Sequence, residues 1–496
     1  MFYFWRWYNC AVRQLKDPLL IAILILSIAL GSSHLTRGQD WGDDFAAYIM
    51  QAKSIVQGNM PEFIQRNSFT INTSTENIGA VAYPWGYPLI IAPVYAIAGL
   101  DLSALKLPTL LFYAGFLVCL FILMRRKLDR GKSLLIVALF AFNPTYLQFL
   151  DHILSDIPFL FFSTLALLWM DFCEDDHRAA FAWALGPVIF MAFFIRVTGI
   201  FLLLVFSCVQ VIQIIRHRND LDLIRRTIRL MLIVWLVFGA LGLISALVFP
   251  AGSESYISEL ASFSAGTFLD NLSSYFQVFG SFFGTDAVSA LIYYFAFVFF
   301  VLGLWIRKKR DAIFIIYFFI VVASLIIWPY FQGIRLILPL LPLFLYFAIQ
   351  GLSFTVEHLT WKRYEFGKVV FYGFGLVIVL SFFTTSTVHA YTNIRNDRQV
   401  SGPFDKYSIQ TYDFIKNETP ADSVIIFFKP RLLHLMTGHD TFESTKCQPM
   451  HLGDYLMLVK GPSKYRQIPV GLIKMCHLDL REVFENEVFV AYRIQK

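Results

Sequence analysis

Long apolar segments constrain the fold of this chain more than any other feature. Eleven of them have about the 17–25 residues that an α-helix needs to cross the core of a bilayer. They are residues 19–36, 107–124, 133–150, 157–173, 180–195, 199–215, 230–249, 287–306, 312–329, 336–352 and 369–388. Only 15% of the residues are charged, whereas a soluble domain carries about a quarter. The sequence therefore predicts a polytopic α-helical membrane protein, and its net charge of +6 gives no indication of nucleic-acid binding.

Lysine and arginine predict the orientation of these eleven transmembrane helices. Basic residues cluster in residues 125–132, 216–229, 307–310 and 362–368, whereas residues 251–286 contain none. Short cytoplasmic loops retain positive charge, and a cytoplasmic N-terminus places all four clusters inside. Because eleven is an odd number, the segment after the last span is expected to be extracytoplasmic.

A shorter apolar stretch, residues 87–99, is left out of this count. It contains Pro88 and Pro93. Counting it as a span would reverse every later loop and place the basic clusters outside. We therefore expect a re-entrant or interfacial helix, which is the usual meaning of so short an apolar run.

The composition changes near residue 391 to that of a soluble domain. We expect a membrane domain over residues 1–390, with residues 37–86 as its first outer loop, and an extracytoplasmic α/β domain over residues 391–496. The elements predicted there are helices over 406–417 and 430–437, strands over 424–428 and 455–459, and a hairpin formed by 483–484 and 488–494. About 100 residues suffice for a small core of this kind.

Two cysteines, Cys447 and Cys476, fall in this outer domain. An oxidising compartment permits a disulfide between them. Two unpaired thiols are the alternative, because the sequence does not supply the Cα separation that a bridge needs.

Two adjacent carboxylates, Asp43 and Asp44, open a helix expected in the first outer loop. A hydrated acidic pair at the membrane boundary contributes little to packing, so a chemical role is a serious candidate. Asp40 is a candidate N-cap, which would place Asp43 in the first turn, where acids favour the helix dipole. Asp44 is harder to explain in this way, and it shares an edge of the predicted helix with Tyr48.

Further polar residues, which belong to separate segments, are predicted to lie on the same outer face of the bundle. They are Tyr83 and Tyr87 at the end of the first loop, Asp151, His152 and Asp156 in the next outer loop, and Arg196 and Arg335 beside later spans. Ionisable residues at a membrane are costly and are functional candidates by default. The structural alternatives are loop caps for the acids and contacts with lipid headgroups for the arginines. We favour a phosphate-binding role for Arg335.

In this order and topology the motifs resemble those of the GT-C membrane glycosyltransferases. The motifs are the acidic pair with Tyr48, Tyr-Pro-Trp-Gly-Tyr-Pro at 83–88, Leu-Ser-Asp-Ile-Pro-Phe at 154–159, Arg-Val-Thr-Gly at 196–199, Arg335 ahead of Leu-Pro-Leu-Leu-Pro, and residues 412–422. The resemblance covers most of the chain. It is to the bacterial set that includes lipid A aminoarabinose, protein O-mannosyl and lipopolysaccharide-core transferases. Together the motifs are specific for the fold and not for a sugar.

The resemblance implies an inverting transfer from a polyprenyl-phosphate-linked sugar to a glycolipid, polysaccharide or protein acceptor. The reaction would take place on the periplasmic side of a bacterial inner membrane. By this analogy an aspartate of the first loop is the general base. Asp44 matches if the spacing to Tyr48 is kept, and Asp43 matches if the pair is counted from its first member. The relatives often have glutamate second in the pair and arginine before the tyrosine, where this chain has Asp44 and Ala47.

These residue types suit the chemistry. A sugar on a phosphodiester already has a good leaving group, so the site needs a carboxylate that deprotonates the acceptor hydroxyl. It also needs arginine, which makes bidentate contacts with phosphate. Asp44, Arg196 and Arg335 are expected to supply these groups. Some relatives use a divalent cation, for which Asp151, His152 and Asp156 are candidate ligands.

The alternative function is a polytopic transporter or a lipid-linked sugar flippase. Such proteins are also polytopic with buried charges. A secondary transporter typically shows an internal repeat and a binding site at mid-membrane. Here no repeat is evident, and the predicted charges lie at the outer edge, which favours the enzyme.

Overall fold

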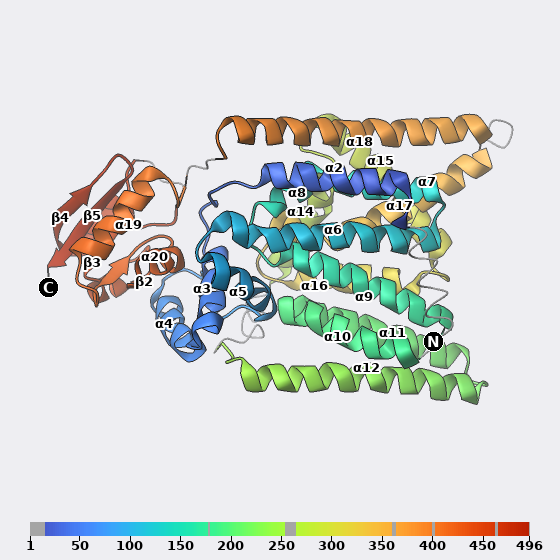
Figure 1. Ribbon diagram of the computed structural model, residues 1–496, viewed down its shortest axis with the longest axis horizontal. Helices are drawn as coiled ribbons and strands as arrows, with labels where there is room; N and C mark the ends of the chain where they lie inside the picture. Colours follow the sequence, from blue (N-terminus) through green and yellow to red (C-terminus); the bar gives the residue numbers. More distant parts are fainter. Residues whose placement is uncertain are drawn as a thin grey trace.

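The computed structural model describes residues 15–176, 179–252, 264–359, 364–398, 402–461 and 465–495. A bundle of helices occupies one end of the molecule and a small sheet domain the other (Figure 1). The predicted cytoplasmic N-terminus up to residue 14, and the basic residues Lys362 and Arg363, lie outside the described residues.

The bundle is built from apolar helices. They are α2 (Pro18–His34), α6 (Leu102–Lys127), α7 (Arg130–Ala141), α8 (Pro144–Leu150), α9 (Asp156–Asp176), α10 (Ala179–Ile195), α11 (Ile200–Arg216), α12 (Leu221–Val248), α14 (Ala265–Val278), α15 (Ala287–Arg307), α16 (Ala312–Ile327), α17 (Leu341–Leu359) and α18 (Tyr364–Arg395). Short 3-10 segments, η1 (Val197–Gly199), η2 (Phe279–Phe282) and η3 (Gly333–Ile337), lie between them. Within the described ranges, six helices are long and apolar enough to cross a membrane, or seven if the bent pair α7–α8 is one span. These helices indicate a membrane protein, whereas the count of eleven stays a prediction.

The predicted span over residues 133–150 is broken into α7 and α8, which meet at 54°. Pro144 cannot continue the first helix, because it lacks the amide hydrogen and its ring clashes with the preceding turn. The Asn143 side chain caps α8 by accepting the amide of Thr145 at 3.0 Å, and it donates to the Phe282 carbonyl at 2.9 Å. The break is therefore a fixed corner. Asp151 follows directly after α8, so the corner sets its position.

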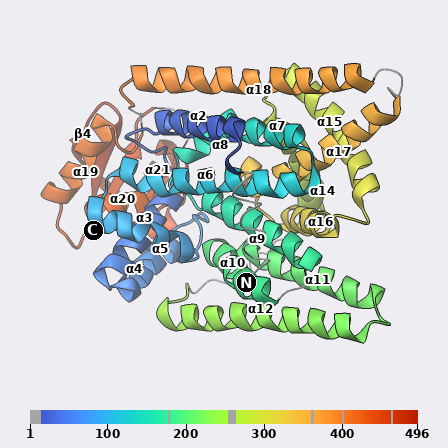
Figure 2. The same cartoon turned by 45° about the vertical axis from the view of Figure 1, so that its right-hand side comes forward.

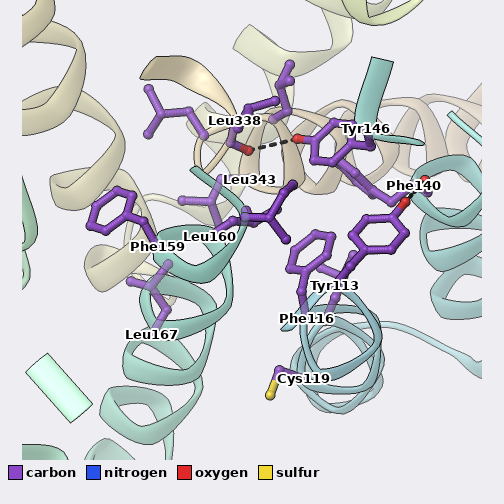
Figure 3. Close-up of a cluster of buried hydrophobic side chains, with 14 of the residues drawn as sticks. Tyr113, Phe116, Cys119, Phe140, Tyr146, Phe159, Leu160, Leu167, Leu338 and Leu343 are labelled. Carbon is purple, nitrogen blue, oxygen red and sulfur yellow. Dashed lines mark hydrogen bonds between the residues drawn. The ribbon is translucent and has the colours of Figure 1, made fainter. Parts of the chain in front are cut away.

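An aromatic cluster fills the bundle beneath this corner (Figure 3). Tyr146 and Phe116 stack with ring centroids 6.2 Å apart, and Phe140 meets Tyr146 edge-on at 5.0 Å. The Tyr146 hydroxyl donates to the carbonyl of Leu338 at 2.9 Å. Buried tyrosine hydroxyls need such a partner. This bond ties α8 to the chain just after η3, the segment that carries Arg335.

The first outer loop is helical, with α3 (Asp44–Gln57), α4 (Met60–Thr73) and α5 (Gly86–Ala98). These helices lie between the bundle and the sheet domain (Figure 1). Gly86 approaches the end of α10 so closely that a Cβ would lie 2.5 Å from the Phe194 carbonyl. Only glycine permits this approach, which brings the start of α5 next to Arg196.

One expectation about this loop needs correction, and one helix in it was not predicted. The residue before α3 is Asp43 and not Asp40, and its side chain makes no capping bond. The Asp43 carboxylate faces Lys429 of the sheet domain instead. Helix α4 was not predicted, because its weakly apolar sequence resembles that of a loop.

The sheet domain follows α18. Its elements are α19 (Lys406–Glu418), β1 (Val424–Ile426), α20 (Pro430–Thr437), β2 (Asp440–Phe442), η4 (Gln448–Leu452), β3 (Tyr455–Val459), α21 (Val470–Met475), β4 (Asp479–Glu485) and β5 (Phe489–Gln495). The strand order is β2-β1-β3-β5-β4, with β1 parallel to β2 and β3 and the β4–β5 hairpin antiparallel. The predicted helices and strands are present. Two further elements, β2 and α21, were not predicted, because each is too short to show a pattern in the sequence. A disulfide joins Cys447 and Cys476, with their Cα atoms 5.2 Å apart.

Candidate active site

Asp44, the first residue of α3, lies where the bundle meets the outer loop. Its Oδ1 accepts the Tyr83 hydroxyl at 2.6 Å, and its Oδ2 accepts Nη1 of Arg335 at 3.1 Å. The side chain stays 34% exposed. Hydrogen bonds to a charged group are strong, so these two contacts orient the carboxylate while part of it remains accessible.

Asp156, the first residue of α9, joins two arginines from different elements. Nη1 of Arg196 lies 2.8 Å from Oδ1, and Arg335 places Nε 3.3 Å from Oδ1 and Nη2 3.2 Å from Oδ2. The Asp156 side chain is 1% exposed, and a buried carboxylate of this kind requires charged partners. The Asp156 carboxylate also raises the pKa of Arg335. Arg335 therefore stays charged and links the carboxylates of α3 and α9.

Three tyrosines pack together beside Asp44, and Tyr83 is the one that contacts its carboxylate. The Tyr48 ring packs against Tyr83 at 4.9 Å and meets Tyr87 edge-on at 5.0 Å. Its hydroxyl shares a 3.0 Å hydrogen bond with Ser155. Burial, together with the negative charge of Asp44, raises the pKa of both Tyr48 and Tyr83. Tyr83 is thus protonated and donates to Asp44.

Gln51 holds Tyr83 in place, a role that the sequence analysis missed. Its Nε2 donates to the Tyr83 carbonyl at 2.9 Å, and its Oε1 accepts the Tyr83 amide at 3.2 Å. Gln51 is fully buried. Its position two turns beyond Asp44, on the same face of α3, is the signal that would have identified it.

Asp43 lies outside this cluster. It is 7% exposed, and its Oδ2 lies 3.3 Å from Nζ of Lys429. Its Oδ1 has no hydrogen-bond partner among the described residues. Burial raises the pKa of Asp43. The two neighbouring acids thus differ, and only Asp44 is accessible at the arginine cluster.

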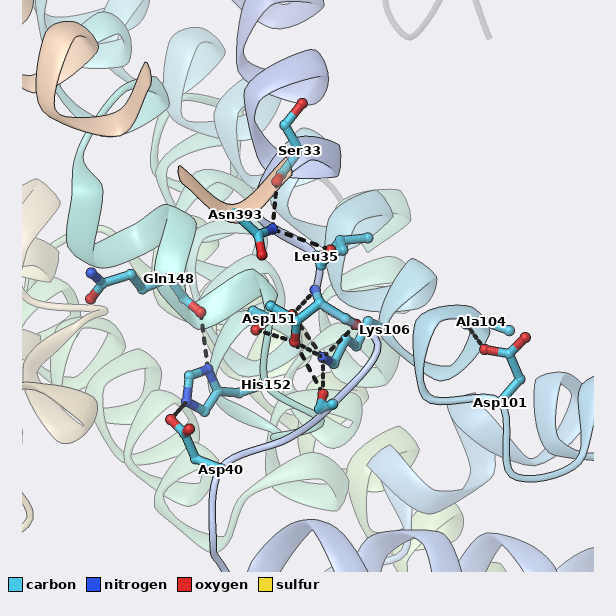
Figure 4. A network of polar contacts seen from close by, with 12 residues as sticks. Ser33, Leu35, Asp40, Asp101, Ala104, Lys106, Gln148, Asp151, His152 and Asn393 are labelled. Carbon is cyan, nitrogen blue, oxygen red and sulfur yellow. Dashed lines mark hydrogen bonds and ion pairs between the residues drawn. The ribbon is translucent and has the colours of Figure 1, made fainter. Parts of the chain in front are cut away.

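Asp151 and His152 occupy a separate network (Figure 4). Asp151 accepts Nζ of Lys106 at 2.7 Å, the Thr36 amide at 2.6 Å and the Thr36 hydroxyl at 2.7 Å. His152 bonds the Gln148 carbonyl at 2.9 Å through Nδ1. The oxygens of Asp151 are occupied, so this network braces the chain that leads from α2 into the outer loop.

The structure does not bring the three candidate metal ligands together. Asp151 pairs with Lys106, His152 lies 3.7 Å from Asp40, and Asp156 pairs with the two arginines. Within the described part of the chain, no group of three or more His, Cys, Asp or Glu side chains is placed to hold a metal ion.

An apolar cavity of about 250 Å³ adjoins the cluster. Its walls come from residues 80–85, the end of α10 and the end of α12, and include Tyr83, Trp85, Phe194 and Phe249. The Trp85 ring stacks on Phe249 at 5.5 Å and its Nε1 donates to the Pro250 carbonyl at 2.9 Å. Val197, the neighbour of Arg196, also contributes to the lining. An apolar surface thus lies next to the charged site.

No protein-family model and no curated protein matches the sequence. Solved structures do match. ArnT from Cupriavidus metallidurans bound to undecaprenyl phosphate is 12% identical with a TM-score of 0.58, over 96% of this chain and 98% of that chain. The archaeal oligosaccharyltransferase AglB from Archaeoglobus fulgidus, in complex with an inhibitory peptide and a dolichol-phosphate, is 11% identical with a TM-score of 0.54, over 90% of this chain and 70% of that chain. Both are GT-C glycosyltransferases, so the predicted GT-C-like fold is confirmed.

Proposed function

We propose that this chain is an integral membrane glycosyltransferase, which moves a sugar from a polyprenyl-phosphate-linked donor to an acceptor hydroxyl. The observation that carries the proposal is the cluster of Asp44, Arg335, Asp156 and Arg196, with contacts of 2.8–3.3 Å between helices distant in sequence. An accessible carboxylate beside two arginines suits a base next to a phosphate site. The bound undecaprenyl phosphate of ArnT and dolichol-phosphate of AglB support this class of donor.

Asp44 is the proposed general base. Its Oδ2 contacts Arg335, and its Oδ1 is held by Tyr83. When a donor phosphate binds, Arg335 turns toward the phosphate and releases Oδ2, which then accepts the proton of the acceptor hydroxyl. A positioned general base contributes about 10²–10⁴ in rate.

The proposed transfer is a single displacement that inverts the anomeric carbon. The acceptor oxygen forms a bond to that carbon as its proton passes to Asp44. The bond between the carbon and the phosphate oxygen breaks, and its electron pair leaves with the phosphate. Arg335 and Arg196 stabilise the resulting charge, because guanidinium groups match phosphate geometry. Asp156 holds both arginines in place.

The polyprenyl chain is proposed to lie in the apolar cavity between Trp85, Phe194 and Phe249, beside the arginines. We propose the orientation that the basic loops predict, with a cytoplasmic N-terminus and the site and the sheet domain on the periplasmic side of a bacterial inner membrane. Both views place the sheet domain at the same end of the bundle as α3 (Figure 1, Figure 2). The acceptor is a glycolipid, a polysaccharide or a protein.

Mass spectrometry of host cells tests this function. Envelope glycolipids and glycoproteins are compared between cells with the wild-type protein, cells with Asp44→Asn at equal expression, and cells without the protein. We expect a sugar-sized mass that requires the protein and disappears in Asp44→Asn. An unchanged set of glycans in all three would argue against a transferase and favour a transporter.

A further inference from the structure

We propose that Arg431 of the sheet domain is a positioning residue of the transferase site, which acts on Asp44 through Tyr83. This inference rests on the proposed function, because it concerns the same carboxylate. Arg431 lies in the first turn of α20, and Asp44 begins α3. The two helices belong to opposite ends of the sequence and pack against each other (Figure 2).

Arg431 is fully buried and makes three contacts with the segment that ends in Tyr83. Its Nη1 lies 3.3 Å from the Tyr83 hydroxyl, its Nη2 donates to the Ala80 carbonyl, and its guanidinium carbon lies 5.4 Å from the centre of the Tyr83 ring. A buried guanidinium is tolerated only when paired. The positive charge of Arg431 opposes the burial that raises the pKa of Asp43.

These contacts fix the direction of the hydrogen bond between Tyr83 and Asp44. Arginine has donors only, so Arg431 occupies a lone pair of the Tyr83 oxygen. The single hydroxyl proton of Tyr83 is then free to point at Asp44 Oδ1, 2.6 Å away. Arg431 also polarises that hydroxyl, because hydrogen bonds in a chain strengthen one another. Tyr83, oriented by Arg431, therefore holds one oxygen of the Asp44 carboxylate, while the other oxygen meets Arg335.

The backbone around Tyr83 is shaped for this contact. Gly79 has φ of +107°, and a Cβ there would lie 2.4 Å from the Tyr83 hydroxyl and 3.3 Å from Nη1 of Arg431. A side chain at this position would push the two groups apart. Lys429, two residues before Arg431, meets Asp43 at 3.3 Å. The sheet domain thus contacts Asp43 directly through Lys429 and reaches Asp44 through Tyr83.

Arg431 should therefore affect kcat, whereas Arg335 and Arg196 should determine the KM for the donor. Loss of Arg431 leaves Arg335 and Arg196 in place, so the KM for the lipid-linked donor should stay near the wild-type value. The carboxylate loses its fixed orientation, and we expect kcat to fall by about 10–100-fold, as for small misplacements of a reacting group. Tyr83→Phe should give a loss of the same size.

The test is a double-mutant cycle on kcat with Arg431→Met, Tyr83→Phe and the combined variant, each as the full chain in lipid. If Arg431 acts through Tyr83, the combined variant loses no more than Tyr83→Phe alone. Arg431→Lys, which keeps a charged donor, should recover part of the loss. Losses that multiply in the combined variant would overturn the proposal, and so would full activity of Tyr83→Phe, a variant that lacks only one hydroxyl.

Arg466→Met is the matched control. Arg466 belongs to the same domain contact, with Nη1 3.7 Å from Glu76, but it is 73% exposed and does not touch Tyr83. Its kcat should stay within about twofold of wild type, because exposed ion pairs contribute little. Wild-type transfer that is abolished by Asp44→Asn but unchanged by Arg431→Met and Tyr83→Phe would refute this inference alone. Absence of any transfer by the wild type would refute the proposed function with it.

Discussion

Asp43 and Asp44 are adjacent in the sequence and lie in different surroundings. Asp44 contacts Tyr83 and Arg335 and is partly accessible, whereas Asp43 is buried against Lys429. Neighbouring residues at the start of a helix point about 100° apart. One carboxylate therefore faces the arginines of the bundle and the other faces the sheet domain. This difference favours Asp44 as the base, a choice that the sequence left open.

Neutral amides at the two positions should separate these roles. Asp44→Asn removes the proton acceptor, and we expect the rate of sugar transfer to fall by about 100-fold or more. Asp43→Asn keeps Asp44 and its contacts, and should cost less than about tenfold in the same assay. The measurement is the initial rate per mole of folded protein. A larger loss in Asp43→Asn would move the base by one residue.

Arg335→Lys should weaken binding of the donor. Lysine keeps the charge but not the planar fork that reaches both Asp156 and the proposed phosphate. A hydrogen bond to a charged group contributes about 1.5–3 kcal/mol, so the KM for the lipid-linked donor should rise about 10–100-fold. Arg196→Lys, at the other arginine, is the companion variant. A donor KM unchanged in both would place the phosphate elsewhere.

At the scale of helices and strands, the sequence predicted what local patterns determine. Apolar length and proline positions gave α5 to within one residue at each end, and the acidic pair marked the start of α3. The rule that positive charge stays inside placed Asp44, Asp156, Arg196 and Arg335 at one end of the bundle, and they are in contact there. The break between α7 and α8 was missed, because each half is apolar and the span is long enough to cross as one helix.

The contact between α20 and α3 was not predictable from local pattern. Lys429 and Arg431 flank a proline after a short strand, as basic residues on many surfaces do. Their contacts with Asp43 and Tyr83 depend on how a domain more than 300 residues away in the sequence docks. Gln51 was missed for a related reason, since its partner is a backbone segment of the loop before α5.

The corner at Asn143 should contribute measurably to stability. Asn143→Ala removes the cap of α8 and the donor to the Phe282 carbonyl. A lost cap costs about 0.5–2 kcal/mol, so the melting temperature of the protein in detergent should fall. Asn143→Asp keeps the acceptor that caps α8 but loses the donor to Phe282, so its melting temperature should fall less. Melting temperatures equal to wild type in both variants would contradict a fixed corner.

At the scale of the whole molecule, the bundle and the sheet domain meet at the acidic pair. The bundle contributes Asp156, Arg196 and Arg335, the first outer loop contributes Asp44 and Tyr83, and the sheet domain contributes Arg431. No single segment holds the cluster, so its geometry depends on how all three pack. The apolar cavity beside it is where we propose that the polyprenyl chain of the donor lies.

The disulfide between Cys447 and Cys476 provides a test of orientation and stability. Disulfides persist in oxidising compartments, so a periplasmic sheet domain predicts that neither thiol reacts with an impermeant maleimide until a reductant is added to intact cells. The bridge spans 29 positions in the sequence, and its loss should cost the domain about 2–4 kcal/mol. Thermal unfolding of the Cys447→Ala, Cys476→Ala double variant measures this. Thiols that stay unlabelled after the reductant is added would contradict the orientation.

Release of free polyprenyl phosphate tests the central claim most directly. Purified protein in lipid is incubated with the lipid-linked sugars and the envelope acceptors extracted from its host, and the free polyprenyl phosphate formed is quantified by mass spectrometry. We predict release by the wild type that depends on the acceptor extract and falls at least about 100-fold in Asp44→Asn. Equal release by the two proteins, or none by the wild type, would contradict a glycosyltransferase built around Asp44 and Arg335.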